Sequence, residues 1–293
     1  MYELIPVSDH CFYIQCPAKI GLVRLNEQEV CLIDSGSDKD AAKKVLKILQ
    51  ANHWTLKAIY NTHSHADHIG GNAFLQAQTG CKIYAPGAEC GITRHPILEP
   101  SFLYGGFPGK ELRGKFLMAA GSDAEELKPE HLPQGWELIP LPGHSFDMVG
   151  FRTPEDVVYL ADCLSSPETL DKYGITFLYD VAASVQTLEA VKTMKAGTFV
   201  PSHAQPAADI TPLAQYNLDK IREIGDCILD ICRDAMSFEQ ILQQVFEHYS
   251  LKMSFEQHAL VGSTLRSYLS WLKGEGKLGA EFRENVLVWQ SIA

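Results

Sequence analysis

Residues 62–71 (THSHADHIGG) concentrate side chains that bind metal ions. His63, His65 and His68 offer three imidazoles, and Asp67 a carboxylate, within six positions. Histidines two residues apart in an extended segment project to the same side, so His63 and His65 can hold one ion. A solvated turn accounts for a pair of histidines, but packing does not require this density of donors. The pattern therefore predicts a metal site, with Asp67 also capping a following helix.

The elements around this stretch follow from hydrophobic periodicity. Residues 56–60 predict a strand leading into the metal loop, and residues 72–78 predict a helix closed by Gly80. Upstream, short runs of β-branched and aromatic residues predict a meander of hairpins. The other predicted strands are residues 11–14, 20–25, 30–34, 81–85, 136–141, 149–152, 157–162 and 197–203, and the other helices in this part of the chain are residues 38–51 and 182–194.

The His-x-His-x-Asp-His string at residues 63–68 resembles the signature of the metallo-β-lactamase superfamily. The flanking Thr62, and the glycine pair at 70–71 that lets the backbone pass close to the site, are most similar to the glyoxalase II-like hydrolases of that superfamily. Further landmarks follow in the family's order: a Gly-His turn at His144, an apolar strand ending in Asp162, and a strand ending in His203.

This resemblance implies an α+β fold, a four-layer αββα sandwich over residues 1–207. It implies that Asp34 supports the metal loop from behind, although capping of the next helix is an alternative role. Ser202 departs from the family, which usually has glycine before the last histidine. The ligands implied are His63, His65 and His144 for one ion, Asp67, His68 and His203 for a second, and Asp162 as a bridge between them.

Nitrogen and carboxylate ligands suit two zinc ions, although iron or manganese binds the same donors. Two ions about 3.5–4 Å apart lower the pKa of a shared water, so that a metal-bridging hydroxide becomes the nucleophile. Asp67 would orient that hydroxide as a catalytic residue. The predicted function is a dinuclear metal-dependent hydrolase acting on a small-molecule ester, thioester or lactone, and the thioester preference comes only from the resemblance. Relatives that cleave lactones place a tyrosine after the bridging aspartate, and Tyr173 and Tyr179 are both candidates in a predicted loop.

Two alternative functions use the same donors. A phosphodiesterase or ribonuclease of this fold would need a basic surface, whereas the chain of 293 residues carries a net charge of −11. An iron-binding redox or regulatory protein is the other alternative, but redox relatives usually have glutamate where this chain has His65.

Residues 87–134 form an insertion in which periodicity weakens and prolines alternate with aromatic residues. The aromatic content predicts an ordered lid rather than a disordered excursion. Within it, residues 102–107 (FLYGGF) are predicted to line the substrate pocket, with simple packing against the body as the alternative.

Residues 208–293 change character. Three predicted helices over 216–235, 238–249 and 254–273, followed by two short strands, resemble the winged helix appended in some relatives. From residue 207 on, eight lysines and arginines stand against twelve aspartates and glutamates. Because this accessory domain is acidic, we expect it to serve packing, homodimerisation or the pocket wall and not nucleic-acid binding.

The eight cysteines lie mostly in apolar runs without a Cys-x-x-Cys pair, which indicates reduced, structural residues. No run approaches the roughly 18 apolar residues of a membrane span, and the N-terminus lacks a signal-peptide pattern. These features predict a cytoplasmic protein with no membrane contact.

Overall fold

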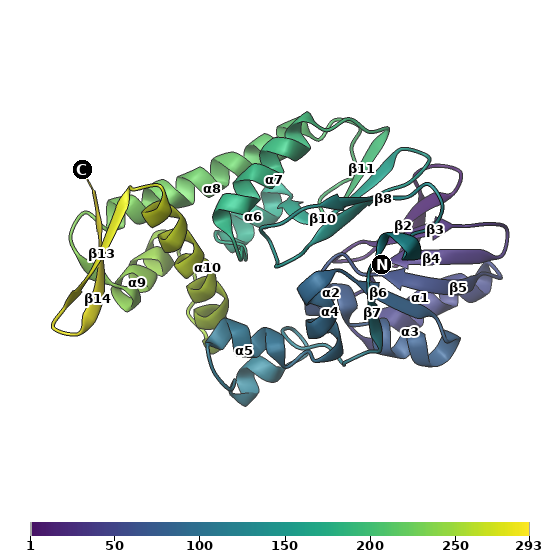
Figure 1. Cartoon of the computed structure of the whole chain (residues 1–293), viewed down its shortest axis with the longest axis horizontal. Helices are drawn as coiled ribbons and strands as arrows, with labels where there is room; N and C mark the ends of the chain where they lie inside the picture. The colour runs from purple at the N-terminus through teal and green to yellow at the C-terminus, as the bar shows by residue number, and fades with distance from the viewer. Residues whose placement is uncertain (1, 293) are drawn as a thin grey trace.

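The computed structural model describes residues 2–292 and places two β-sheets face to face, with helices on both outer sides (Figure 1). The first sheet is antiparallel from β1 to β4 and parallel from β4 to β7. Its strands, in spatial order, are β1 (Glu3–Pro6), β2 (Cys11–Gln15), β3 (Ile20–Arg24), β4 (Glu29–Ile33), β5 (Thr55–Tyr60), β6 (Lys82–Ala85) and β7 (Ala124–Glu126).

The second sheet has the order β11-β10-β9-β8, and its β10–β11 pair is parallel. Its strands are β8 (Glu137–Pro140), β9 (Val149–Arg152), β10 (Val157–Ser165) and β11 (Thr198–His203). The outer helices are α1 (Lys39–Ala51) and α3 (Asn72–Thr79) on the first sheet, and α6 (Pro167–Tyr173), α7 (Val181–Thr193) and α8 (Thr211–Ile231) on the second. The predicted four-layer αββα sandwich is confirmed.

Separate apolar clusters fill the layers. Between the sheets, aromatic rings of both sheets pack together, with Tyr60 from β5 against Phe151 from β9. Outside the first sheet, Val45 and Leu49 of α1 cover the strands, and outside the second sheet Leu188 of α7 does the same. These clusters hold the ends of both sheets in a fixed relation, which any site built from both sheets requires.

The insertion is more regular than the sequence predicts. It contains α4 (Gly87–Arg94), then α5 (Leu98–Tyr104), two short 3-10 helices and β7, which joins the first sheet. Pro100 suggested irregular chain, but it lies in the first turn of α5, where its missing N–H has no partner to lose. The 3-10 helices are η1 (Lys110–Arg113) and η2 (Pro129–His131).

The chain after α8 forms β12 (Met236–Ser237), α9 (Phe238–His248), α10 (Phe255–Gly274), β13 (Leu278–Arg283) and β14 (Val286–Ser291). The three strands form a small sheet of order β12-β14-β13, one strand more than the sequence predicts. Ser237 and Gln240 form a capping box at the start of α9. The core outside the second sheet continues into these helices, and a domain division at residue 207 stays a prediction.

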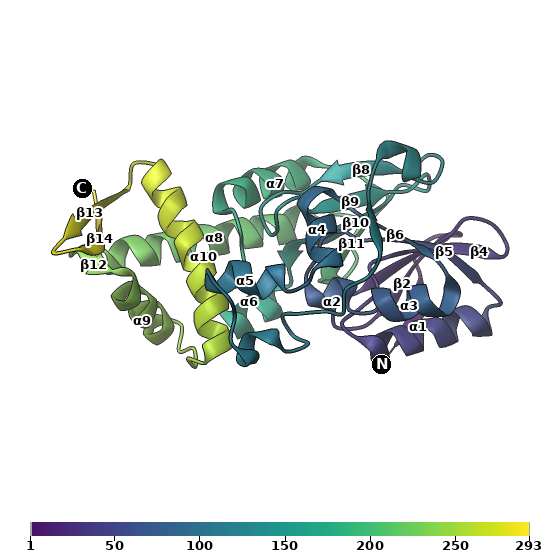
Figure 2. The ribbon, with the colours of Figure 1, turned by 60° about the horizontal axis from the view of Figure 1, so that its bottom comes forward.

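Helix α10 packs against the insertion, as both views of the ribbon show (Figure 2). Leu103 and Leu112 of the insertion form an apolar cluster with Ala259 of α10, and Phe177 packs against it. Besides the packing of α8 on the second sheet, the C-terminal elements therefore contact the insertion through α10.

Within residues 2–292, no helix combines the length and the apolar composition that crossing a membrane requires. The eight cysteines form no disulfide, and six of them are buried.

A carboxylate links the two sheets through a turn of the second sheet and a loop of the first. Glu155, in the β9–β10 turn, accepts hydrogen bonds from the Ser8 hydroxyl and from the amide and ring of His10, in the β1–β2 loop. Burial opposes ionisation of Glu155, but these donors lower its pKa to about 2.

We expect Glu155→Gln to flatten the acid dependence of stability. Because the folded-state pKa lies below the unfolded value of roughly 4.3, the ionised Glu155 stabilises the fold above that pH and loses this contribution as the pH falls towards 2. The free energy of unfolding, measured by urea titration between pH 6 and 2, should fall less in Glu155→Gln than in the wild type. The exposed Glu130→Gln is the control and should keep the wild-type slope; an unchanged slope in Glu155→Gln would contradict this reading.

Candidate metal centre

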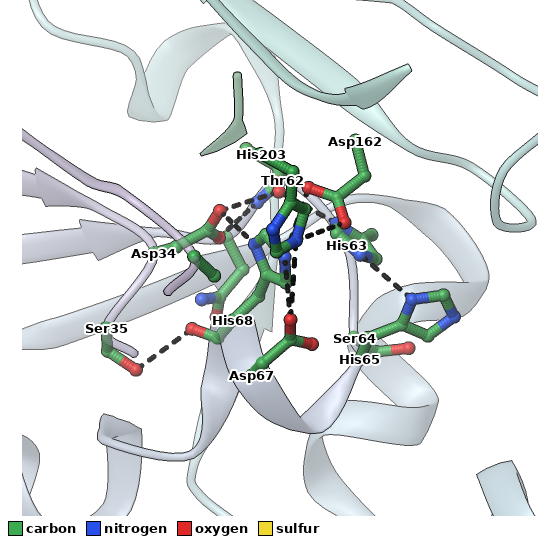
Figure 3. A network of polar contacts seen from close by, with 12 residues as sticks. Asp34, Ser35, Thr62, His63, Ser64, His65, Asp67, His68, Asp162 and His203 are labelled. Carbon is green, nitrogen blue, oxygen red and sulfur yellow. Dashed lines mark hydrogen bonds and ion pairs between the residues drawn. The ribbon is translucent and has the colours of Figure 1, made fainter. Parts of the chain in front are cut away.

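The predicted donors meet at one end of the sandwich, where strands of both sheets terminate (Figure 3). The loop after β5 carries the histidine-rich string, Asp162 lies within β10, and His203 ends β11. His144 lies in the connection from β8 to β9. Because β5 of the first sheet and β11 of the second end on the same side of the sandwich, His63 and His203 become neighbours although they are 140 positions apart in the sequence.

The donors form two groups. Within each group the candidate ligand atoms lie within 4.8 Å of one another. The first, called here the histidine trio, is His63, His65 and His144, and the second, the mixed quartet, is Asp67, His68, Asp162 and His203. This grouping matches the two sets that the sequence predicts.

In the histidine trio, three ring nitrogens converge. His65 Nδ1 lies 3.1 Å from His63 Nε2 and 3.0 Å from His144 Nε2. Burial lowers the pKa of His65 to about 4 and of His144 to about 3, and it holds the pKa of His63 well below its ordinary value. At neutral pH these rings are therefore neutral, the form in which imidazole binds a metal.

In the mixed quartet, two carboxylates face two imidazoles. His203 Nε2 lies 3.0 Å from Asp162 Oδ2 and 3.5 Å from Asp67 Oδ2, and His68 Nε2 lies 3.2 Å from Asp162 Oδ1. Asp162 Oδ2 is also 3.7 Å from His144 Nε2 of the trio. Asp162 thus lies between the two groups, where a bridging ligand has to be.

Asp34 orients two of the histidines from behind. Its Oδ2 accepts hydrogen bonds from His68 Nδ1 and from the Thr62 hydroxyl, both at 2.8 Å, and its Oδ1 accepts from the Thr62 amide at 2.8 Å. Because the Thr62 hydroxyl donates to Asp34, it accepts from His63 Nδ1 at 2.9 Å. Both rings therefore carry a proton on Nδ1, which leaves Nε2 of each ring facing the other donors.

Two backbone distortions accompany this arrangement. Asp34 has φ 65° and Ala161, next to Asp162, has φ 51°, both in the left-handed region. Such a conformation costs roughly 1–2 kcal/mol for a residue with a Cβ, and strain of this kind concentrates at functional sites. At Ala161 the strand register also shifts, which sets the direction of Asp162.

The glycine pair packs against the loop after β4. A Cβ on Gly70 would lie 2.2 Å from the carbonyl oxygen of Ser37, and one on Gly71 would lie 2.3 Å from that of Ser35. The close backbone passage predicted for these glycines is present, and it joins the metal loop to the segment that carries Asp34.

The donor set fits divalent cations. His68 Nε2 and Asp162 Oδ1 are buried and have no hydrogen-bond partner among the described residues. Buried polar atoms are rarely left this way without an ion or another partner. Burial lowers the pKa of His203, but Asp162 and Asp67 outweigh it and raise that pKa to about 10, so the quartet attracts positive charge. A proton there occupies the place that a cation would take.

Two roles assigned from the sequence differ in the structure. Asp67 does not cap a helix: it lies in the first turn of α2 (Ala66–Ile69), whose N-cap position is His65. Asp34 does not cap α1 either, because Asp38 fills that position and accepts from two amides of the first turn. Hydrogen bonding to Thr62 and His68 takes Asp34 away from any cap.

Sequence reasoning missed three residues near the trio. Glu89 and Glu99 of the insertion contact the metal loops, and the ring of Phe177 lies edge-on to His65 and His144. None belongs to a motif, and the burial of the two glutamates appears only in the structure, so no sequence signal singled them out.

The aromatic segment of the insertion lies beside the centre rather than within the donor set. Phe102 packs with Phe146 and Tyr179, while Tyr104 is half exposed and Phe107 is 76% exposed. Tyr173 ends α6 and is not in a loop. Among residues 2–292, neither the Tyr173 nor the Tyr179 hydroxyl forms a hydrogen bond to the seven donors, so neither tyrosine is selected.

The family model described as the metallo-beta-lactamase superfamily matches residues 13–203. The chain belongs to this superfamily. The match begins in β2 and ends at the last candidate ligand, so it contains every donor described above.

Relatives named hydroxyacylglutathione hydrolase are similar to about half of the chain. The protein from Methylococcus capsulatus is 29% identical over 165 residues, 56% of this chain and 54% of its own length. That from Vibrio campbellii is 39% identical over 150 residues, 49% of this chain and 48% of its own length. The chain thus matches only about half the length of these relatives.

Solved structures match over nearly the whole chain. A beta-lactamase domain protein from Burkholderia ambifaria has a TM-score of 0.71 at 16% identity, covering 99% of this chain and 94% of that one. A metallo-beta-lactamase family protein from Thermus thermophilus has a TM-score of 0.70 at 15% identity, covering 100% and 98%. The C-terminal elements therefore have counterparts on the same fold.

We expect Asp34→Asn to weaken metal binding about 10- to 100-fold, the usual effect of removing a partner that orients a ligand. Asparagine has one accepting oxygen where Asp34 has two, so its NH₂ faces either the Thr62 amide or both His68 Nδ1 and the Thr62 hydroxyl, and the hydrogen bonds on that side are lost. Competition with a chromogenic zinc chelator measures the change. Asp38→Asn, four residues away at the α1 cap, is the matched control and should bind like the wild type; equal affinity in Asp34→Asn would exclude this role.

Proposed function

We propose that this protein is a dinuclear metal-dependent hydrolase that cleaves an ester, thioester or lactone of a small molecule. The observation that carries the proposal is the convergence of seven donors in two adjacent groups, in which the buried His68 Nε2 and Asp162 Oδ1 lie 3.2 Å apart and form no hydrogen bond. Membership of the metallo-β-lactamase superfamily supports it.

The histidine trio would hold one ion and Asp67, His68 and His203 the other, with Asp162 between them. Two zinc ions suit these donors, and iron or manganese are the alternatives. When bound, such ions supply Lewis acidity, which lowers the pKa of water and polarises a carbonyl oxygen.

Asp67 is the donor best placed to handle a proton. Its side chain is 44% exposed, whereas those of His63 and His68 are fully buried. Although burial opposes ionisation, His68 and His203 hold the pKa of Asp67 below its usual value, so it is a carboxylate at neutral pH. A carboxylate at the open side of the centre accepts a hydrogen bond from the attacking water and orients it.

The acyl class of substrate comes from the relatives. Their name specifies hydrolysis of a hydroxyacyl group carried by glutathione. We extend the acyl chemistry to this chain, because it is similar to these relatives over about half of its length and its metal loop lies inside the region that the superfamily model matches. Glutathione is left with those relatives.

Two observations oppose a phosphodiester substrate. The C-terminal region is acidic, and phosphate binding depends on clustered lysine and arginine. In a helix-turn-helix the second helix reads the groove, but α10, which would hold that place, packs against the insertion.

The test is metal content together with a substrate panel. We expect about two zinc ions per chain by elemental mass spectrometry, and turnover of a thioester or lactone that chelator abolishes and zinc restores. Bis(p-nitrophenyl) phosphate and a β-lactam complete the panel. Cleavage of the phosphodiester alone, or iron with no hydrolysis of any substrate, would replace the proposal with one of the other functions.

Asp67→Ala should lower kcat/KM on the accepted substrate by at least about 100-fold, since it removes both a ligand and the proton acceptor. The exposed Asp123→Ala is the control and should retain wild-type kcat/KM. Steady-state kinetics at saturating zinc separates loss of chemistry from loss of metal; wild-type kcat/KM in Asp67→Ala would show that Asp67 has no catalytic role.

A further inference from the structure

Glu89 of α4 is a fully buried carboxylate that connects two metal loops. One oxygen accepts from the Ser64 amide at 3.0 Å and from the Ser64 hydroxyl. The other accepts from the Asp147 amide at 3.1 Å and from the Ser145 hydroxyl. A buried charge needs such compensation, and here four donors of two loops provide it.

These donors are the immediate neighbours of the histidine trio. Ser64 lies between His63 and His65, and Ser145 follows His144. The two loops come from different sheets, since one follows β5 and the other follows β8. One side chain of the insertion therefore fixes the spacing between the loops that carry all three histidines.

Glu99 of α5 reaches the same group from another direction. Its carboxylate is only 6% exposed, and its Oε1 lies 3.4 Å from His65 Nε2. Because His65 Nδ1 faces the other two histidines, Nε2 is the nitrogen that carries the proton and faces Glu99. Burial raises the pKa of Glu99 to about 8, but a carboxyl oxygen accepts from the His65 N–H in either protonation state and so fixes the tautomer and ring orientation of His65.

The insertion is itself held in place. Leu103, one turn after Glu99 on α5, belongs to the apolar cluster with Leu112 and with Ala259 of α10. This packing keeps α5 against the body, so Glu99 is presented from a supported helix.

We propose that the insertion is a positioning element for the histidine trio, in which Glu89 sets the separation of the two loops and Glu99 orients His65. This inference rests on the proposed dinuclear site. It assigns a second function to a segment that the sequence indicates only as a lid. Glu89 and Glu99 contact the loops of the trio, whereas His68 of the mixed quartet is held by Asp34 outside the insertion. The two groups should therefore respond differently to changes in the insertion.

The test measures each ion separately in the full-length protein, using ¹¹³Cd NMR and titration against a competing chelator. Reference variants assign the signals: His144→Ala should remove the trio ion and His203→Ala the quartet ion. We expect Glu99→Leu and Glu89→Gln to weaken the trio ion about 10- to 100-fold and to change the quartet ion by less than about 3-fold. In Glu89→Gln, the side-chain NH₂ replaces one accepting oxygen and faces the backbone N–H of one loop, so the hydrogen bonds to that loop are lost.

Glu99→Gln keeps an acceptor for His65 and should recover most of the affinity lost in Glu99→Leu. Glu130→Gln, a surface glutamate of the same insertion, should bind both ions like the wild type. Thermal unfolding of the metal-free variants shows whether each one folds. If Glu89→Gln does not fold, the comparison of Glu99→Leu with Glu99→Gln still decides the test.

The outcomes separate the two proposals. Wild-type affinity for the trio ion in both Glu99→Leu and Glu89→Gln would overturn the positioning role while the dinuclear site stands. Equal loss of both ions in folded Glu99→Leu would also overturn it, because the effect would not be specific to the trio. If the wild type binds no ion, the proposed function itself fails.

Discussion

The structure depends on holding electron-rich donors close together inside the protein. Two carboxylates of the mixed quartet and the lone pairs of at least two imidazoles point at one another within a few ångströms. Such an arrangement repels itself and loses hydration, and only positive charge placed between the donors compensates it. A chain that folds this way must spend part of its stability on the site, and the strained Asp34 and Ala161 are visible parts of that cost.

The sandwich meets this constraint by building the site from ends of rigid elements. Strands of both sheets stop at the same edge, and the aromatic packing between the sheets fixes the distance between their ends. Asp34 then acts on two histidines at once, since the hydroxyl of Thr62 relays its effect to His63. Ring orientation is thereby set before any ion arrives, which is what selective metal binding requires.

The C-terminal elements pack against two parts of the molecule, which their acidic composition does not indicate. They share a core with the outer face of the second sheet, and α10 also contacts the insertion. This packing supports α5, the helix that carries Glu99, so an accessory region far from the donors in sequence contributes to their surroundings. The whole-chain match to two solved structures indicates that this arrangement accompanies the fold elsewhere.

Much of this protein is determined by the sequence alone. Local spacing was sufficient for most of the strands, the helix closed at Gly80 and the family, because these depend on periodicity and on short motifs. The seven donors were also predicted, since each stands in a recognisable string or at a strand end. The two groups form in space because strands of both sheets end at one edge of the sandwich.

Only the tertiary structure decided which groups surround the donors. Asp34 and Asp38 are both aspartates near a helix start, yet one caps α1 and the other binds Thr62 and His68. Glu89 and Glu99 read as ordinary helix residues, because a glutamate acquires its role from partners about 25 to 60 positions away. Periodicity reports which face of an element is buried, but hydrogen-bond partners across elements depend on how the elements pack, which no local pattern encodes.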